Sequence, residues 1–163
     1  MRHCRCVEAL ALAMCDCAER QGLHPNRTTI QQGALLHDIG RSVTQDVRHA
    51  SIGADLLRRE GWPEPVVLAV ERHTGAGIDA TEAASLGLPV KDYTPRSLEE
   101  KIVAHADNLF SGDKRLTLAA LHDKYRVNGL PQAWAKIQAL HDELVATLGT
   151  DLELLEAAPL TEP

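Results

Sequence analysis

Apolar residues recur at three- and four-residue steps along most of this chain, which is the spacing of one face of an α-helix. The first such stretch spans residues 7–18, and Gly22 follows as a residue that commonly ends helices. His3 lies one helical turn before Val7 and therefore shares the buried face of this helix. The same periodicity predicts further helices over residues 28–38, 48–60, 63–73, 97–107, 117–125 and 131–148. Residues 76–96 are less regular and leave room for a short helix at 78–86.

Particular residues mark several of these helix ends. Gly40 suits the position just past the end of the second helix, where a left-handed backbone is common. Ser97 followed by Glu100 is typical of a capping box at a helix start. Together the pattern predicts a single all-α domain, a bundle of about six to seven helices over residues 1–150. An acidic tail at residues 151–163 is expected to fray from it.

Composition supports this fold class and limits the kinds of molecule that the protein is expected to bind. Hydrophobic residues make up 44% of the 163 residues and aromatic residues only 3%, so aliphatic side chains must fill the core, which favours helix packing. The net charge of −6 argues against nucleic acid as the main partner, because phosphate backbones attract clustered lysine and arginine. No apolar run approaches the roughly 20 residues that cross a bilayer, and the first residues lack a signal-peptide pattern. We therefore expect a cytoplasmic protein without a membrane partner.

The cysteines all lie near the beginning of the chain, as Cys4, Cys6, Cys15 and Cys17. Their C-x-C spacing suggests metal binding, but residues two apart on a helix point about 200° apart and cannot share one ion. We predict free thiols in a reducing compartment, with a second metal site as the alternative.

Histidines and aspartates are distributed so that they can close a metal site. His37 and Asp38 stand side by side after the apolar residues 33–36. Similar side chains near helix ends or on apolar faces are His3, His49, His73 and Asp107. Each histidine alone is more often a satisfied structural residue. As a set they favour a metal, because five helices would bring them to one centre and an unpartnered buried imidazole or carboxylate costs several kcal/mol.

This ligand chemistry suits iron, manganese, nickel, cobalt or zinc better than an all-oxygen calcium cage. Six ligands exceed what one catalytic ion needs if it keeps a position open for water, so we predict two ions with Asp38 as the bridge. Such a pair activates a water and clamps the oxygens of a phosphoryl group. The remaining histidines, His24, His122 and His141, are predicted to be surface or packing residues, and His105 has at most a supporting role.

Four segments resemble the HD superfamily of metal-dependent phosphohydrolases, whose members carry a histidine, an HD dyad and a distant aspartate. These segments are ALLHDIG (34–40), HASIGADLL (49–57), ERHTGAG (71–77) and LEEKIVAHADNL (98–109). The resemblance extends from residue 2 to about residue 115 and points to the subgroup whose dyad continues as HDIG. The histidine contexts resemble HD-type diadenosine tetraphosphate hydrolases. The whole stretch is more similar to small, mostly archaeal HD-domain proteins of unassigned activity.

The resemblance implies a helical HD domain that holds two divalent ions. One ion would take His3, His37, Asp38 and Asp107, and the other would take His49 and His73 and share Asp38. We expect iron or manganese, with nickel, cobalt, zinc or magnesium as alternatives. Asp38 and His37 are the predicted catalytic residues. Arg41 stands where many relatives have lysine and is predicted to grip a phosphate, while Lys114 and Arg115 are second phosphate contacts or solvated surface charges.

The favoured function is a metal-dependent phosphohydrolase that acts on a nucleotide or a related phosphoester or phosphoanhydride. Two alternatives remain open at this stage: a di-iron oxygenase of the same superfamily, and a non-catalytic, metal-stabilised nucleotide-binding module. The expected partner is a small phosphorylated substrate, with no nucleic acid. A homodimer is one alternative for the oligomeric state.

His3 is the weakest point of this hypothesis. Relatives usually have a helix before the first ligand, whereas His3 lies two residues from the first residue. Chain ends fray, so we expect His3 to be the least firmly held of the ligands. A later start than in relatives, or a partner subunit that covers this end, would account for the difference.

Overall fold

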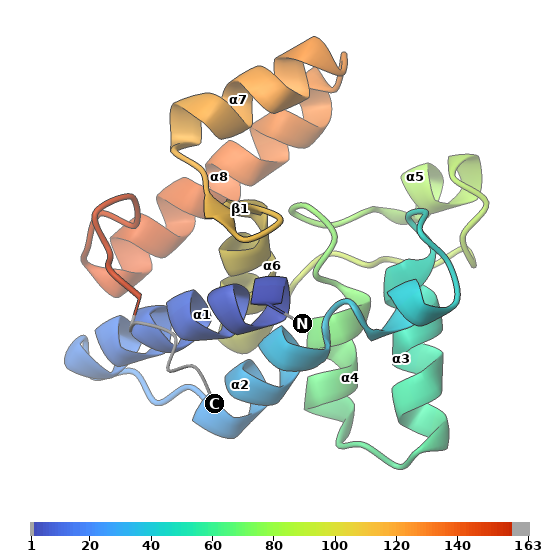
Figure 1. Ribbon diagram of the computed structural model, residues 1–163, viewed down its shortest axis with the longest axis horizontal. Coiled ribbons are helices and arrows are strands. Elements are labelled where there is room, and N and C mark those ends of the chain that lie inside the picture. Colours follow the sequence, from blue (N-terminus) through green and yellow to red (C-terminus); the bar gives the residue numbers. More distant parts are fainter. Residues whose placement is uncertain (1, 158–163) are drawn as a thin grey trace.

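The computed structural model describes residues 2–157, which form a helical bundle with one small hairpin (Figure 1). In chain order the helices are α1 (Arg2–Arg20), α2 (Arg27–Leu36), η1 (Ile39–Ser42, a 3-10 helix), α3 (His49–Arg59), α4 (Glu64–Glu71), α5 (Ala80–Ser85), α6 (Leu98–Asn108), α7 (Leu118–Val127) and α8 (Pro131–Leu148). Strands β1 (Phe110–Ser111) and β2 (Lys114–Arg115) pair antiparallel after α6. The all-α class is confirmed. The hairpin was not predicted, because two-residue strands are too short to show a period.

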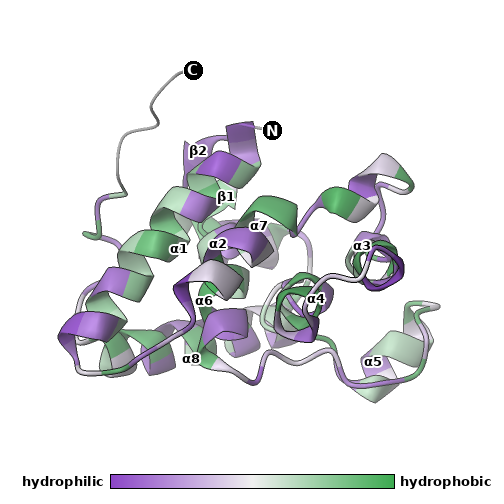
Figure 2. Ribbon diagram, turned by 90° about the horizontal axis from the view of Figure 1, so that it is seen from below, coloured by the Kyte–Doolittle hydropathy of each residue, from purple (hydrophilic) through white to green (hydrophobic). Residues whose placement is uncertain are grey.

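Helix α1 forms one wall of the core. Its residues Val7, Leu10, Met14 and Ala18 are fully buried, as the apolar periodicity predicts. They pack with α2 and α6, and in Figure 2 the middle of α1 is apolar while its two ends are hydrophilic. Burial of each large aliphatic side chain stabilises the fold by about 1.5–3 kcal/mol. This packing holds the first turn of α1 close to the end of α2 and to the hairpin (Figure 1).

Most observed helix ends differ from the predicted ends by one or two residues, and two of these differences change the role of a particular residue. Helix α2 is capped by Asn26, whose side chain accepts the N–H of Thr29 at 3.0 Å, so the cap lies before the predicted threonines. Helix α4 ends at Glu71, where the backbone of Arg72 leaves the helical region. His73 therefore lies just beyond α4 and not on its face, which corrects the predicted helix over residues 63–73.

Gly40 has a role other than the predicted helix cap. Its φ is not positive, and it lies inside η1. A Cβ at this position would collide with the carbonyl oxygen of His49 and would come within 2.7 Å of the Gly53 amide nitrogen. Gly40 is therefore needed for the close approach of η1 to the start of α3, and this approach brings His49 beside Asp38.

The capping box predicted at Ser97 is only half formed. The Ser97 hydroxyl accepts the Glu100 N–H at 3.2 Å. The Glu100 carboxylate accepts instead from the Arg96 N–H at 2.8 Å and from the Arg72 guanidinium at 2.9 Å. Glu100 is buried, so the ion pair with Arg72 connects α6 to the end of α4. The serine still starts α6 where the sequence predicts it.

The beginning of the acidic tail is packed on the bundle, contrary to expectation. Leu152 is fully buried, and its carbonyl oxygen accepts from the Arg115 guanidinium at 2.7 Å. The Glu153 carboxylate accepts the N–H of Leu118 at 2.7 Å, at the start of α7. An apolar side chain and two hydrogen bonds thus hold residues 151–157. The rest of the predicted tail, 158–163, lies outside the described residues.

The cysteines and the lengths of the helices can also be compared with the sequence predictions. The four cysteines are free thiols on α1, and no group of potential metal ligands within residues 2–157 includes one of them. Among the helices of the described segment, none has the length and apolar character needed to cross a membrane.

Candidate metal centre

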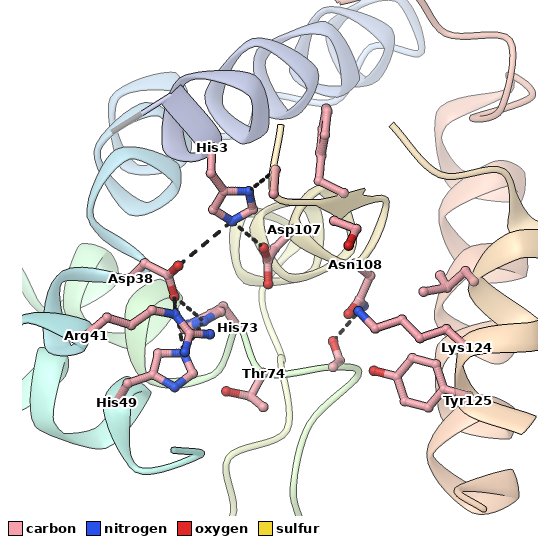
Figure 3. A pocket seen from close by; sticks show the side chains of 15 residues that line it. His3, Asp38, Arg41, His49, His73, Thr74, Asp107, Asn108, Lys124 and Tyr125 are labelled. Carbon is pink, nitrogen blue, oxygen red and sulfur yellow. Dashed lines mark hydrogen bonds and ion pairs between the residues drawn. The ribbon is translucent and has the colours of Figure 1, made fainter. Parts of the chain in front are cut away.

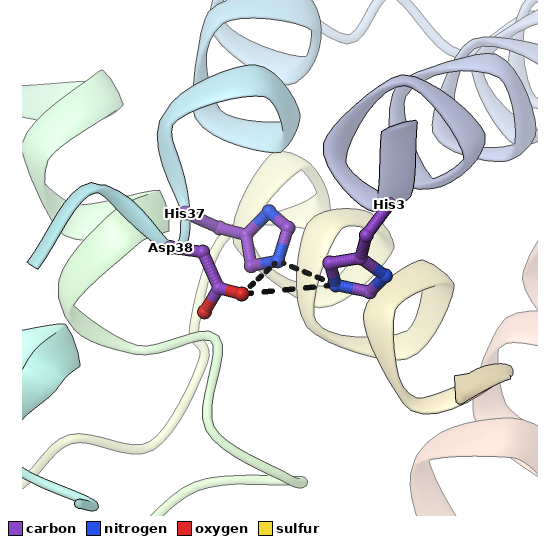
Figure 4. Close-up of side chains that lie close together, drawn as sticks. All are labelled: His3, His37 and Asp38. Atoms are coloured by element: carbon purple, nitrogen blue, oxygen red, sulfur yellow. Dashed lines mark hydrogen bonds and ion pairs between the residues drawn. The ribbon is translucent and has the colours of Figure 1, made fainter. Parts of the chain in front are cut away.

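Six histidine and aspartate side chains from distant parts of the chain meet at one place. They come from the first turn of α1, the junction of α2 and η1, the start of α3, the loop after α4 and the last turn of α6. Figure 3 shows all of them except His37, which is drawn in Figure 4. The residues are His3, His37, Asp38, His49, His73 and Asp107. They form three overlapping groups in which the ligand atoms lie within 4.8 Å of one another. All six ligands predicted from the sequence are therefore brought together.

Each of the four imidazoles is fixed through its Nδ1 by a backbone carbonyl oxygen. The contacts are His3 to Gly112 at 2.7 Å, His37 to Ala34 at 2.7 Å, His49 to Asp46 at 2.8 Å and His73 to Val70 at 2.7 Å. A carbonyl oxygen only accepts, so each Nδ1 must carry the proton. Each Nε2 consequently presents its lone pair in the neutral ring, which is the orientation that metal-binding histidines require.

The Nε2 atoms face one another in two pairs. The Nε2 atoms of His3 and His37 are 3.1 Å apart, and those of His49 and His73 are 3.0 Å apart. Figure 4 shows the first pair beside Asp38. Two neutral rings cannot hydrogen-bond through two lone pairs, so a proton or another cation is needed at each pair. Imidazole nitrogens with nearby carboxylates are the donor set of iron, manganese, cobalt, nickel and zinc. The arrangement therefore fits a divalent metal centre.

Asp38 lies between the two histidine pairs. Its Oδ2 is 3.7 Å from His37 Nε2 and 3.9 Å from His3 Nε2. Its Oδ1 is 3.3 Å from His49 Nε2 and 3.9 Å from His73 Nε2. One carboxylate thus offers one oxygen to each pair.

Asp107 lies nearest to His3 and His37, and it also forms a group with His37 and His73. Its Oδ1 lies 3.0 Å from His3 Nε2 and 3.4 Å from His37 Nε2. His3 therefore contacts Asp107, His37 and the carbonyl oxygen of Gly112 at the hairpin turn. These contacts correct the expectation that His3 is loosely held, and they give the unpredicted hairpin a clear role.

Burial and charge set the protonation states of these side chains. Burial raises the pKa of Asp38, but the hydrogen bond with His49 and the neighbouring imidazoles outweigh it and leave the pKa below its usual value. The pKa of Asp107 is lowered for the same kind of reason, through His3 and His37. Burial lowers the pKa of His73 to about 4, with a further contribution from the charge of His37. Ionised carboxylates and a neutral His73 are the forms that bind a metal.

The loop that carries His73 is held by side chains of α6. Asn108 Nδ2 donates to the carbonyl oxygen of Gly75 at 2.8 Å, and Glu100 pairs with Arg72 on the other side of His73. Asn108 was not identified from the sequence as a residue that supports the site. Its position next to the predicted ligand Asp107 could have indicated this role. These bonds fix a short loop that has no regular structure of its own.

A cavity of about 480 Å³ opens over the centre. Arg41 lines it and donates from Nε to Asp38 Oδ1 at 2.6 Å and from Nη1 to the Gln45 carbonyl oxygen at 3.2 Å. Opposite the histidines, Lys124 and Tyr125 extend from α7 into the cavity (Figure 3). The cavity therefore combines metal ligands with two cationic side chains.

The predicted second phosphate contacts lie elsewhere. Neither Lys114 nor Arg115 lines this cavity. Lys114 is an exposed residue of β2, and the Arg115 guanidinium is engaged by the carbonyl oxygen of Leu152. Lys124 lines the cavity instead. No local pattern could indicate this, because only the packing of α7 on α8 places Lys124 opposite the metal ligands.

The other histidines lie outside the centre. His24 and His122 are exposed, and the ring of His122 lies against Trp134 with centroids 4.8 Å apart. His105 is buried and points towards α8, where its Nε2 is 3.0 Å from His141 Nδ1. His105 therefore does not support the ligands, and His141 is a packing residue as predicted.

The fold and this ligand set define the protein's class. The family model of the HD domain matches residues 1–112, and the chain belongs to this family. Membership and the histidine–aspartate groups together indicate a divalent metal site.

Among its relatives is an uncharacterised protein of Methanocaldococcus jannaschii, 42% identical over 146 residues that cover 88% of this chain and 86% of that protein. A protein of Picrophilus torridus named tRNA (cytidine(56)-2'-O)-methyltransferase is 47% identical over 153 residues, 94% of this chain but only 43% of its own length. This chain therefore spans less than half of that relative.

One solved structure has a similar fold. It is the HD domain of the L. monocytogenes phosphodiesterase PgpH in complex with cyclic-di-AMP. The TM-score is 0.51 at 21% identity, and the match covers 90% of this chain and 88% of that one. The likeness extends beyond the family-matched residues and so includes part of the C-terminal helices.

Proposed function

We propose that this protein is a metal-dependent phosphohydrolase that cleaves a nucleotide or a related phosphoester or phosphoanhydride. The observation that carries the proposal is the pair of facing Nε2 contacts on either side of Asp38, below a cavity lined by Arg41 and Lys124. The HD domain match and the phosphodiesterase fold likeness support the same class.

The geometry around Asp38 supports two ions. His3, His37 and Asp107 share one side with Asp38 Oδ2, while His49 and His73 share the other side with Asp38 Oδ1. Iron or manganese fits this mixture of imidazole and carboxylate, and nickel, cobalt, zinc or magnesium are the alternatives to be tested. Ions held there would polarise the phosphoryl group and lower the pKa of a bound water.

The side chains around the centre bind and orient the substrate. Arg41 Nη2 has no hydrogen-bond partner in residues 2–157, so this edge of the guanidinium is available to a phosphate oxygen. The Lys124 ammonium has no acidic partner in the same part of the chain and offers a second positive charge. In the reaction a water oxygen bonds to phosphorus, the bond to the leaving oxygen breaks, and the water proton passes to the leaving group or to solvent.

The test is metal analysis of anaerobically purified protein, followed by assays against a panel of nucleotides and phosphoesters. Each assay is run with manganese, iron, cobalt and nickel, and metal-free protein obtained with a chelator is the control. We expect bound metal, anaerobic release of phosphate or a phosphomonoester, and loss of this activity in the metal-free control.

Three other outcomes would each contradict the proposal. Oxygen consumption by iron-loaded protein without anaerobic cleavage would indicate the di-iron oxygenase. Tight nucleotide binding without turnover under any metal would indicate a binding module. Methyl transfer to tRNA by this chain alone would assign to it the activity named for its longer relatives.

A further inference from the structure

A second cavity adjoins the metal cavity. Its volume is about 470 Å³, and it lies between the loop after α4, helix α5 and the turn from α7 to α8. Thr74, Gly75 and Tyr125 line both cavities, so the two spaces adjoin at these residues. In Figure 3, Thr74 and Tyr125 are drawn among the side chains around the metal cavity. A substrate bound at the metals would pass these shared residues to reach the second cavity.

The walls of this second cavity, here called the side chamber, are largely apolar. Its apolar lining side chains include Ala76, Ile78, Leu86, Leu130 and Ala133. Leu86 and Leu130 are each 48% exposed. Two large apolar residues exposed at one cavity indicate a site for an apolar group, because exposed apolar surface that is concave and grouped commonly binds ligands.

Charge differs sharply between the two spaces. The lysine of the side chamber, Lys136, is already neutralised by Glu82 and by Asp79, the latter at 3.4 Å. In the metal cavity Arg41 pairs with Asp38 but keeps its Nη2 edge free, and Lys124 has no acidic partner within residues 2–157. An anionic group therefore favours the metal cavity, and an uncharged group favours the side chamber.

A few polar atoms at the junction favour a heterocycle over an alkyl chain. The Thr74 hydroxyl oxygen is buried without a hydrogen-bond partner in the described part of the chain. The Tyr125 hydroxyl has no partner there either, and it lies 3.9 Å from the point where a Gly75 Cβ would stand. Burial raises the pKa of Tyr125, so this hydroxyl stays protonated and can donate. A mostly apolar pocket with a small number of such groups is typical of small-molecule recognition.

We propose that the side chamber binds the base of a nucleotide whose phosphate occupies the metal cavity. The base lies between the apolar side chains of α5 and of the α7–α8 turn, and Tyr125 lies at the junction of base and phosphate. This inference rests on the proposed phosphohydrolase function and names the substrate class as a nucleotide with an intact base.

The experiment compares four nucleoside monophosphates (AMP, GMP, CMP and UMP) with ribose 5-phosphate, which lacks a base. Binding to manganese-loaded protein is measured by equilibrium dialysis, and phosphate release is measured separately. At least one nucleotide is expected to bind about tenfold more tightly than ribose 5-phosphate, since the base buries apolar area. Equal affinity for all five compounds, or binding of none, overturns the proposal.

Variants of the side chamber test whether the base binds there. Ala133→Phe fills the side chamber and is expected to weaken nucleotide binding about tenfold while changing ribose 5-phosphate binding much less. Ala139→Phe, the same substitution at an exposed position of α8, is the matched control and should change neither. Equal behaviour of the two variants contradicts the assignment. Leu130→Ala, which only shortens an exposed side chain, should weaken nucleotide binding two- to fivefold even if Ala133→Phe disturbs folding.

The two proposals fail in different ways. Base-dependent binding without hydrolysis would refute the phosphohydrolase function and leave the side chamber in place. Hydrolysis of nucleotides and ribose 5-phosphate with the same KM would refute the side chamber and leave the phosphohydrolase function in place.

Discussion

The protein contains two kinds of close histidine contact, and their surroundings give them different roles. In the metal centre, His49 and His73 lie 3.0 Å apart at the base of an open cavity. In the core between α6 and α8, His105 and His141 also lie 3.0 Å apart. The distance alone therefore does not distinguish a metal site from a packing contact.

The difference lies in the second ring nitrogen and in the neighbouring charges. Both Nδ1 atoms of the His49–His73 pair donate to carbonyl oxygens, which leaves two lone pairs facing each other beside the Asp38 carboxylate. The Nδ1 of His105 has no partner within residues 2–157, and the contact with His141 uses one ring's Nε2 and the other ring's Nδ1. One proton therefore satisfies that pair as an ordinary hydrogen bond, and no cation is needed.

The largest expected effect is that of Asp38→Ala. Among residues 2–157, Asp38 is the carboxylate whose oxygens come within 3.9 Å of both histidine pairs, so its loss should remove both ions and all turnover. Metal content per protein is measured together with phosphate release. Asp55→Ala, an exposed aspartate of α3, is the matched control and should retain both. Retained turnover in Asp38→Ala would refute the two-ion mechanism.

His49→Ala should affect one ion only. His49 contacts Asp38 Oδ1 and His73 but not the side that holds His3, so the metal-to-protein ratio is expected to fall from two to one. Loss of a residue that only supports a metal ligand costs about 10- to 100-fold in activity. Loss of a ligand itself should therefore lower turnover by at least as much. His122→Ala, at an exposed histidine, should behave like the wild type. An unchanged metal-to-protein ratio in His49→Ala would contradict the assignment of one ion to each histidine pair.

Lys124→Ala separates the two candidate lysines. Because Lys124 lines the cavity, its removal should raise KM about tenfold, equivalent to about 1.4 kcal/mol, with a smaller change in kcat. Lys114→Ala should leave both constants unchanged, because Lys114 is exposed on β2 away from the cavity. Steady-state kinetics on the best substrate decide the question, and the reverse result would restore the prediction made from sequence.

The smallest effect is expected in the core pair. Burial, with the nearby charges of His141 and Arg115, lowers the pKa of His105 from 6.5 to about 3. Below about pH 6.5 the unfolded chain therefore binds a proton at His105, whereas the folded protein does not bind it until about pH 3. The free energy of unfolding consequently falls as the pH drops between these two values, by at most about 1.4 kcal/mol per pH unit.

A double variant, His105→Leu with His141→Leu, should flatten this acid dependence while it leaves metal content unchanged. Urea unfolding at pH 7 and at pH 4.5, with metal analysis of the same samples, provides the measurement. Loss of metal in the double variant would mean that the two histidine regions are coupled.

The sequence determined the fold class and the set of candidate metal ligands. The apolar period of α1 and α8 places their buried faces, and the HD dyad with its companions predicts the same six residues that the structure gathers. Such features depend on side-chain chemistry and on spacing within a few turns, so they can be seen along the chain.

Tertiary structure alone decided what surrounds those ligands. The carbonyl oxygen of Gly112 holds His3 across more than a hundred residues, and Gly40 lets η1 approach α3 without a collision. Lys124 reaches the cavity because α7 packs on α8, while Lys114 and Arg115 turn away into the hairpin and the packed tail. Contacts between backbone atoms and between distant helices leave no periodic trace in a sequence, and they decide which histidine pair can hold a metal and which cannot.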